Sequence, residues 1–360
     1  MKERFKILLL LLFPILAFGK KGDSEFKQTI VKEFNAGSST KLSVTNKYGK
    51  VVVHTWRKNQ VKAVIVITGF GKSVEEAQAI TKMVEIGAET PGDDIVLRTN
   101  YNTSSGNRWF SWGSKKNSKD YVNIDYELFV PEKMEGLELD NNFGDVITDV
   151  LSFPAWIKMN YCSYDIKEAQ QPLELNMNYC DKGWIGKAES VTIKANYSNV
   201  KSDAITSLTI RSNYSDFTIG TVGSLSVAAN YDEYNVTKAG SVTARCNYTD
   251  FRIAELQTTA SARMTYGNFS VKTLTNGFKG ADMDLTYSDV KLGVPLRLPV
   301  QIRVQLTNGS VRTGELSMKT VSNIKKNSSL SYSAITTGGD ERSPEINVRG
   351  VYSDVNLGGN

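Results

Sequence analysis

Apolar and polar residues alternate over short segments of this chain, and the alternation restarts at regular intervals. In one such segment Leu225, Val227 and Ala229 alternate with polar residues, and Tyr234 and Val236 resume the alternation after a polar corner. A period of two is typical of β-strands, and no helical period fits repeats this short and this rich in β-branched residues. Each repeat is therefore predicted to form two short strands separated by a turn.

An aromatic residue marks the corner of each repeat, at a spacing of 17 or 18 residues. A fixed period of this kind is the signature of a solenoid, in which each repeat packs only against its neighbours. We therefore expect an all-β fold, a single-stranded parallel β-helix with rungs of 17–18 residues. Right-handed winding is the expectation for parallel crossovers. The series comprises Phe143, Tyr161, Tyr179, Tyr197, Tyr214, Tyr231, Tyr248 and Tyr266, and it continues less regularly at Tyr287, Asn308, Tyr332 and Tyr352.

An asparagine precedes most of these aromatic residues, so stacked rungs would carry two adjacent columns of like side chains. Asparagine amides can hydrogen-bond from rung to rung at a spacing of about 4.8 Å, and aromatic rings can stack. A structural ladder is the favoured interpretation, and a carbohydrate-stacking face made of the same tyrosines is the alternative. The ladder residues are Asn160, Tyr161, Asn178, Tyr179, Asn196, Tyr197, Asn213, Tyr214, Asn230, Tyr231, Asn247 and Tyr248.

Acidic residues occupy the second position after three successive aromatic residues, at Asp216, Glu233 and Asp250. Oxygen ligands on adjacent rungs could bind calcium. Aspartate and asparagine also favour tight corners, where they stay solvated, and this second interpretation is preferred. No other metal site and no cofactor is predicted.

The N-terminal part differs from the repeat array. Residues 42–53 follow the same template as residues 137–148. Between them we expect a strand over 61–67, a helix from a capping box at Ser73 to about Glu85, and strands over 94–101 and 121–130. A solenoid needs its end rungs covered, so residues 20–131 are predicted to form a repeat-like unit plus a small α+β cap, and residues 132–360 the solenoid domain.

A polar, basic stretch over 102–119 within this cap carries Trp109, Phe110 and Trp112. Exposed aromatic residues on a long loop mark either a binding loop or a segment that packs back on the fold. Packing on the end of the solenoid and contact with a ligand or partner both remain open.

The first 19 residues have the features of a secretory signal peptide. Lys2, Arg4 and Lys6 precede an apolar run over 7–18, and small residues at Ala17 and Gly19 suit cleavage after residue 19. No second apolar run approaches the length of a membrane span, so the cleaved chain is not expected to be an integral membrane protein. Bacterial export is also favoured because Asn-x-Ser/Thr sites fall on the ladder, where a glycan would prevent stacking.

Composition limits the chemistry. With 43 basic and 38 acidic residues the net charge is +5, too mild for a nucleic-acid binder. The single histidine, His54, excludes multi-histidine metal sites, and period two turns it away from the core. Three cysteines allow at most one internal disulfide: Cys162 and Cys180 occupy equivalent positions on adjacent rungs and leave that bond open, whereas Cys246 falls on an inward position.

These features together resemble a known family. Asn46, Tyr48, Gly49 and the following Val51–Trp56 match its N-x-Tyr-Gly-x-V-x-V-x-T-W signature, and a Glu-Glu-Ala helix, an Asp-Tyr-x-Leu-x-Val-Pro strand and Asn-Tyr-Ser-Asp repeats follow in the same order. The chain resembles, from Phe34 to its C-terminus, the bacterial β-strand-repeat "putative adhesin" group, a domain of unknown function in exported proteins. The resemblance implies a parallel β-helix and a surface or periplasmic role, and it carries over no catalytic or binding residue.

We therefore expect an exported, non-enzymatic β-helix protein with a structural or adhesin-like role at the bacterial cell surface or in the periplasm. The alternatives are a carbohydrate-binding or polysaccharide-processing protein and an envelope-sensing module. The candidate partners are a cell-surface glycan or an envelope protein.

Overall fold

The computed structural model describes residues 24–101 and 121–358, and this part of the chain is almost entirely β-structure. Its one helix is α1 (Val74–Thr81). The N-terminal strands are β1 (Ser24–Asn35), β2 (Lys41–Lys47), β3 (Val51–Trp56), β4 (Gln60–Gly71), β5 (Val84–Glu89), β6 (Ile95–Tyr101), β7 (Tyr121–Pro131), β8 (Gly136–Leu151) and β9 (Ala155–Ala169). The later strands are β10 (Leu173–Asn178), β11 (Lys182–Asn196), β12 (Asn199–Asn213), β13 (Asp216–Asn230), β14 (Glu233–Asn247), β15 (Asp250–Leu274), β16 (Gly280–Leu292), β17 (Gln301–Thr307), β18 (Val311–Arg312), β19 (Met318–Lys326), β20 (Ser329–Thr336), β21 (Glu345–Val351) and β22 (Val355–Asn356).

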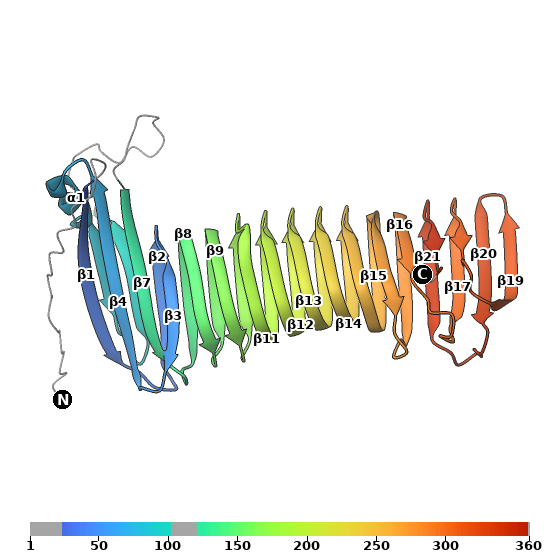
Figure 1. Cartoon of the computed structure of the whole chain (residues 1–360), viewed down its shortest axis with the longest axis horizontal. Coiled ribbons are helices and arrows are strands. Elements are labelled where there is room, and N and C mark those ends of the chain that lie inside the picture. Colours follow the sequence, from blue (N-terminus) through green and yellow to red (C-terminus); the bar gives the residue numbers. More distant parts are fainter. Residues whose placement is uncertain (1–23, 102–120, 359–360) are drawn as a thin grey trace. The chain divides into compact units, whose positions relative to one another are not determined.

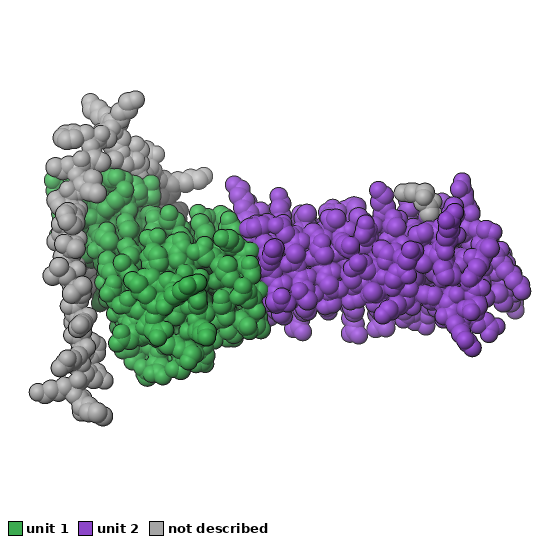
Figure 2. Space-filling view, turned by 60° about the horizontal axis from the view of Figure 1, so that its bottom comes forward, with its two compact units in different colours: residues 1–173 green, residues 174–360 purple. Residues whose placement is uncertain are grey.

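The chain divides into two compact units, residues 1–173 and residues 174–360, which Figure 2 distinguishes by colour. The repeat array forms a β-solenoid, as the aromatic period predicts, with about nine turns in all. The first rungs, β8 and β9, belong to unit 1, together with the cap. The rungs from β11 onward belong to unit 2.

Unit 1 combines solenoid rungs with an antiparallel sheet and one helix. β4 pairs in antiparallel fashion with β1 on one side and with β7 on the other. On its far side β7 pairs in parallel with β3 (Figure 1). Helix α1 packs on β4, and a Cβ atom at Gly69 would lie 2.2 Å from the carbonyl oxygen of Ala77. Only glycine permits this close approach of helix and strand.

The opening repeat lies directly beside the first rung of the main array. β2 pairs in parallel with β8, with Leu42 opposite Leu137 and Val44 opposite Leu139, although these residues are 95 positions apart. The intervening segment forms the expected strands and helix, except that the helix is shorter and is followed by an additional strand, β5. Ser73 caps α1 as predicted, since its hydroxyl accepts a hydrogen bond from the Glu76 amide (3.2 Å). The helix ends four residues early, at Thr81, because the chain turns into β5, which pairs with β6.

Each regular rung of unit 2 is one bent strand with three corners, rather than the two strands and single corner that the sequence predicts. In β13 the alternation of buried and outward residues breaks at two glycine-containing corners, Gly220–Thr221 and Gly223–Ser224, and again at Asn230–Tyr231. Two successive outward residues at each corner redirect the strand without flipping its core face. Phe217, Ile219, Val222, Leu225 and Val227 consequently all lie in the core.

The last rungs of unit 2 do not follow chain order. β21 pairs in parallel with β16 on one side and with β17 on the other, so the C-terminal segment lies between two rungs that precede it in sequence (Figure 1). β20 and β19 then add an antiparallel hairpin to the far edge of β17. The expectation that Tyr332 continues the aromatic series is therefore wrong, because Tyr332 lies in β20, and Tyr352 takes the next place after Tyr287.

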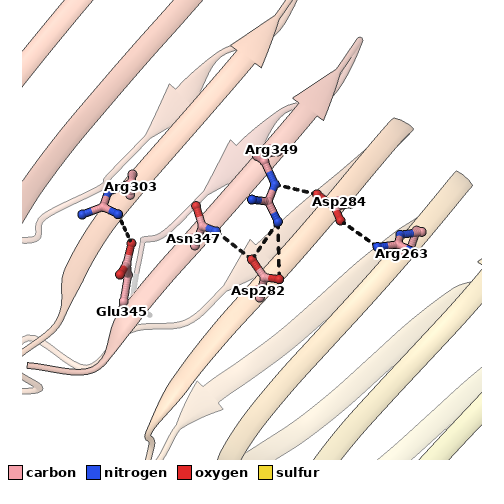
Figure 3. Close-up of polar contacts among 7 residues, drawn as sticks. All are labelled: Arg263, Asp282, Asp284, Arg303, Glu345, Asn347 and Arg349. Carbon is pink, nitrogen blue, oxygen red and sulfur yellow. Dashed lines mark hydrogen bonds and ion pairs between the residues drawn. The ribbon is translucent and has the colours of Figure 1, made fainter.

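Outward side chains fix the inserted strand on both sides (Figure 3). The Arg349 guanidinium donates from Nε to Asp284 (2.7 Å) and from Nη2 to Asp282 (3.2 Å), and Asn347 donates to Asp282 (2.7 Å). On the other side Arg303 forms an ion pair with Glu345 (3.2 Å). The hydrogen bond from Arg349 is the main reason that the pKa of Asp284 lies below its usual value. Because these groups are exposed, each pair adds at most about 1 kcal/mol.

Candidate functional site

Within each unit the predicted aromatic column forms a row on one corner of the solenoid, and its backbone is unusual. Tyr48 and every member of the series except Tyr332 have a positive φ, between 49° and 64°. This left-handed conformation costs a residue other than glycine roughly 1–2 kcal/mol. The corner therefore requires a favourable interaction to hold a tyrosine where glycine would be easier. We call this row the tyrosine ladder, and in unit 2 it comprises Tyr179, Tyr197, Tyr214, Tyr231, Tyr248, Tyr266, Tyr287 and Tyr352.

Ring stacking supplies that interaction. Successive rings of the unit 2 ladder have centroids 4.7–5.1 Å apart and planes within 1–10° of parallel. Each aromatic pair contributes roughly 0.5–1.5 kcal/mol beyond the area that it buries. Each pair is shared by two rings, which gives about one pair for each residue, so stacking offsets part of the backbone cost of the corner.

Stacking also determines what the ladder presents to solvent. Both faces of an inner ring are covered by its neighbours, and the tyrosines of the unit 2 ladder remain 43–51% exposed. A sugar ring that stacks on an aromatic side chain needs an open face. The ladder instead offers a row of ring edges and phenol hydroxyls, so its polar contacts would be hydrogen bonds to the hydroxyl groups.

The asparagine column lies beside the tyrosine ladder and is joined by side-chain hydrogen bonds. In unit 2 each Nδ2 donates to the Oδ1 of the asparagine one rung earlier, at 2.9–3.1 Å, from Asn196, Asn213, Asn230 and Asn247. In unit 1 Asn160 donates to Asn142 in the same way (2.8 Å). All of these amides point along one direction, and such chains of hydrogen bonds polarise one another.

A third column, which the sequence pattern did not predict, consists of small buried residues immediately after each tyrosine. The Ser215 hydroxyl donates to the Asn213 carbonyl (3.0 Å) and accepts from the Ser198 amide (3.2 Å). It thereby satisfies backbone groups that the left-handed corner leaves without a ladder partner. The sequence does contain a signal for this column, because a small residue follows the tyrosine at these positions. The other members of unit 2 with this arrangement are Ser198, Thr249, Ser288 and Ser353.

Asp232 is the one carboxylate in that column and is 5% exposed. Its carboxylate accepts hydrogen bonds from the Ser212 hydroxyl, the Ser215 amide (2.9 Å) and the Tyr234 hydroxyl (3.2 Å). Burial raises the pKa of Asp232 above its ordinary value, and these hydrogen bonds only partly counteract the shift. Folding therefore disfavours the charged form of this side chain.

The raised pKa of Asp232 predicts a pH dependence of stability. Between the unfolded value, 3.8, and the higher folded value, the native state binds the extra proton, so the free energy of unfolding falls as pH rises through this window. Asp232→Asn keeps the shape and removes the ionisation, and it should therefore raise the thermal midpoint at pH 7 and abolish this decline. Asp181→Asn, at an exposed position, serves as the control and should change neither property. Loss of stability at pH 7 in the Asp232→Asn variant would contradict the assignment.

The acidic candidates for calcium binding lie on adjacent rungs, with Asp216 beside Glu233 and Glu233 beside Asp250. Two of the three carboxylates interact with neighbouring groups: Glu233 pairs with Arg252, and Asp250 accepts a hydrogen bond from the Asn268 backbone amide (2.9 Å). In residues 24–101 and 121–358 no group of three or more His, Cys, Asp or Glu residues is arranged to hold a metal ion. The geometry favours corner and ion-pair roles for these acids.

His54 lies on the outer side of β3 and contacts two carboxylates. Its Nδ1 lies 2.8 Å from Asp149 and its Nε2 lies 3.4 Å from Glu127, and its ring stacks on Phe129 with centroids 5.1 Å apart. Both ring nitrogens therefore face acidic groups. His54 is therefore part of a cluster of polar side chains on the surface of unit 1.

The remaining candidates are the cysteines and the aromatic loop. Cys162, Cys180 and Cys246 are all buried thiols, so the disulfide that the sequence left open is not formed in this structure. Burial raises the pKa of Cys246 to about 12, which makes it unreactive at neutral pH. The candidate binding loop with Trp109, Phe110 and Trp112 lies outside the described residues. The described part of the chain has no helix long and apolar enough to cross a membrane.

Three solved structures of bacterial proteins are similar to this chain. A "putative cell adhesion protein" from Clostridium sporogenes is 12% identical, with a TM-score of 0.21 over 94% of this chain and 100% of the other. A "putative adhesin" from Parabacteroides merdae is 12% identical, with a TM-score of 0.37 over 74% and 92%. A "putative lipid binding protein" from Parabacteroides distasonis is 10% identical, with a TM-score of 0.31 over 91% and 96%. No model of a protein family matches the chain, and no curated protein matches it.

Proposed function

We propose that this protein is an exported, non-enzymatic, adhesin-like β-solenoid whose tyrosine ladder contacts a partner at the cell surface or in the periplasm. The observation that carries the proposal is the continuous row of half-exposed tyrosines on unit 2. Tyrosine is enriched in binding interfaces, and contiguous exposed aromatic surface marks interaction sites. Phenylalanine rings would stack equally well in a purely structural ladder. All eight residues of the unit 2 tyrosine ladder nevertheless carry a hydroxyl group.

The geometry of the ladder favours an extended partner rich in hydrogen-bonding groups. Ring centroids repeat every 4.7–5.1 Å, so an extended polymer could meet several hydroxyls at once. Many weak contacts of this kind add up to useful affinity through multivalency. A cell-surface glycan is the partner class that we favour over an envelope protein, because hydroxyl groups on a sugar chain can both donate to and accept from a phenol.

Two further parts of the proposal rest on the sequence and on side-chain chemistry. Export rests on the basic start and short apolar run of the first 19 residues. The non-enzymatic role rests on the acidic residues Glu233 and Asp250 and on His54, all of which contact neighbouring groups rather than a shared cleft. An envelope-sensing role stays an alternative, and co-purification with a membrane regulator from native envelopes would favour it.

Replacing Tyr197, Tyr214 and Tyr231 together by phenylalanine should separate binding from stability. The rings and their stacking remain, so the thermal midpoint should change by no more than a few degrees, whereas binding to a glycan array or to intact cells should fall about tenfold or more because three hydroxyls are lost. A triple replacement elsewhere on the same rungs, Lys201, Thr218 and Asn235 to alanine, is the matched control. Unchanged binding in the phenylalanine variant, or equal loss in the control, would show that the ladder is only structural.

A further inference from the structure

β1 is a long edge strand in unit 1. In the described residues its only strand neighbour is β4, to which it pairs over all 12 of its residues. Just beyond β1 the Ala36 amide donates to the Asn59 carbonyl (3.1 Å), in the same register. Because bonding alternates along an antiparallel pair, the even-numbered residues of β1 bond to β4 and the odd-numbered residues direct their N–H and C=O groups outward.

The core-facing side of β1 is not fully covered. Phe26, Ile30 and Phe34 lie on the same face as the buried residues of β4, since Ile30 pairs with Ile65 and Phe34 with Val61. None of the three is fully buried, whereas Ile65 and Val61 are 0% exposed. The edge of this sheet therefore presents three apolar side chains together with a row of outward backbone groups.

The sequence of β1 is complementary to itself. An antiparallel pairing of two copies centred on Ile30 puts Phe26 opposite the partner's Phe34 and Ile30 opposite the partner's Ile30, all on the core-facing side. On the outer side it puts Lys27 opposite the partner's Glu33. Both the aromatic and the charged pairs occur twice because of the two-fold symmetry.

Neighbouring registers lack this match. Shifting the centre one residue toward the N-terminus puts Glu25 opposite the partner's Glu33 and Phe26 opposite the partner's Lys32. A shift by one residue the other way puts Ile30 opposite the partner's Lys32. Like charges or an apolar residue against a charge disfavour both alternatives, so the sequence specifies one register.

The edge strand of the C-terminal hairpin in unit 2, β19, differs from β1 in its charges. β19 exposes Val321 and Ile324 but carries three lysines, Lys319, Lys325 and Lys326, and no acidic residue. Lysines on an edge strand oppose pairing with another strand. β1 carries both lysine and glutamate residues, so its charges are compatible with pairing to a second copy. The lysines of β19 would repel those of a second copy.

We propose that β1 is an interface for a second copy of this chain, forming a two-fold symmetric dimer by antiparallel β1–β1 pairing centred on Ile30. The outward backbone groups of Glu25, Lys27, Thr29 and the other odd-numbered residues bond to their counterparts, and the sheet continues across the dimer axis. Phe26, Ile30 and Phe34 are covered by the partner's equivalent residues. This interface does not depend on the function proposed for the tyrosine ladder.

A charge exchange tests the interface on the full chain without its signal peptide. Lys27→Glu or Glu33→Lys alone places like charges opposite each other twice, and the dimer dissociation constant measured by analytical ultracentrifugation should rise about tenfold or more. The double variant restores opposite charges and should restore dimerisation. Circular dichroism should show unchanged folding, since both side chains lie on the outer, exposed side of β1.

A cysteine scan tests the register itself. Ile30→Cys brings two thiols together on the dimer axis, within the range for a disulfide, and mild oxidation should give a covalent dimer. Gln28→Cys on the same face is the matched control, because its two copies lie four residues apart along the strands, about 13 Å, and should not cross-link. A wild-type chain that stays monomeric at about 100 μM, or a dimer that none of these variants alters, would overturn the proposal; cross-linking at Gln28→Cys but not at Ile30→Cys would overturn the register.

Discussion

Removing residues 344–360 should destabilise unit 2 severely. The deletion takes away β21 and β22, and with them four side chains that are 0–1% exposed, Ile346, Val348, Val355 and Leu357. Burying each such side chain contributes about 1.5–3 kcal/mol, so the loss is about 6–12 kcal/mol, comparable to the whole stability of a typical domain. Chemical denaturation and limited proteolysis of the truncated chain should show rungs β16 to β20 unfolded or aggregated.

The control for this deletion is Arg349→Ala, which removes the exposed ion pairs with Asp282 and Asp284 and keeps the backbone and core residues of the inserted strand. Because exposed pairs contribute little, this variant should lose at most about 1–2 kcal/mol. A truncated chain with the same denaturation midpoint and protease resistance as the full chain would show that β21 is not needed between β16 and β17.

Phe251→Ala should cost unit 2 about 3–5 kcal/mol of unfolding free energy. Phe251 is 0% exposed and lies in an internal aromatic column, with ring centroids 4.6 Å from Tyr234 and 5.5 Å from Phe269. The substitution leaves a cavity and removes two ring contacts, and parallel rungs on both sides prevent the site from collapsing. Urea denaturation followed by far-ultraviolet circular dichroism gives the measurement.

Two companion variants interpret that result. Phe251→Leu keeps most of the volume and should recover more than half of the loss, because volume-conserving changes are tolerated best. Tyr231→Phe, on the exposed ladder, should be close to neutral. If Phe251→Ala were as mild as Tyr231→Phe, the internal column would not be a main source of stability.

The rungs could be predicted because their signals are local. Leu225, Val227 and Ala229 alternate with polar residues, which indicates a strand, and one aromatic residue marks each turn of the solenoid. The shared template of residues 42–53 and 137–148 is also visible in the sequence, and the structure shows that the two segments pair, with Leu42 opposite Leu137. Identical positions must stack in a solenoid, so repetition in sequence translates into register.

Other features depend on information that a local pattern does not contain. The left-handed conformation of Tyr214 could not be predicted from its residue type, because a positive φ usually signals glycine or asparagine, and here ring stacking opposes that preference. The position of Tyr352 next to Tyr287 depends on which strand fits between β16 and β17, a tertiary choice that spacing cannot reveal. β1 lies outside the repeat pattern altogether, and the pattern predicted nothing for it.

The place of β21 has a consequence for the order in which the protein is made. β16 and β17 leave the ribosome before Glu345–Val351, which must later enter between them. Until then the nascent chain has an open slot bounded by two strand edges, and unit 2 cannot be completed from its N-terminal side alone. A chain that lacks Glu345–Val351 keeps this slot open and exposes the two strand edges to proteases and to pairing with other chains.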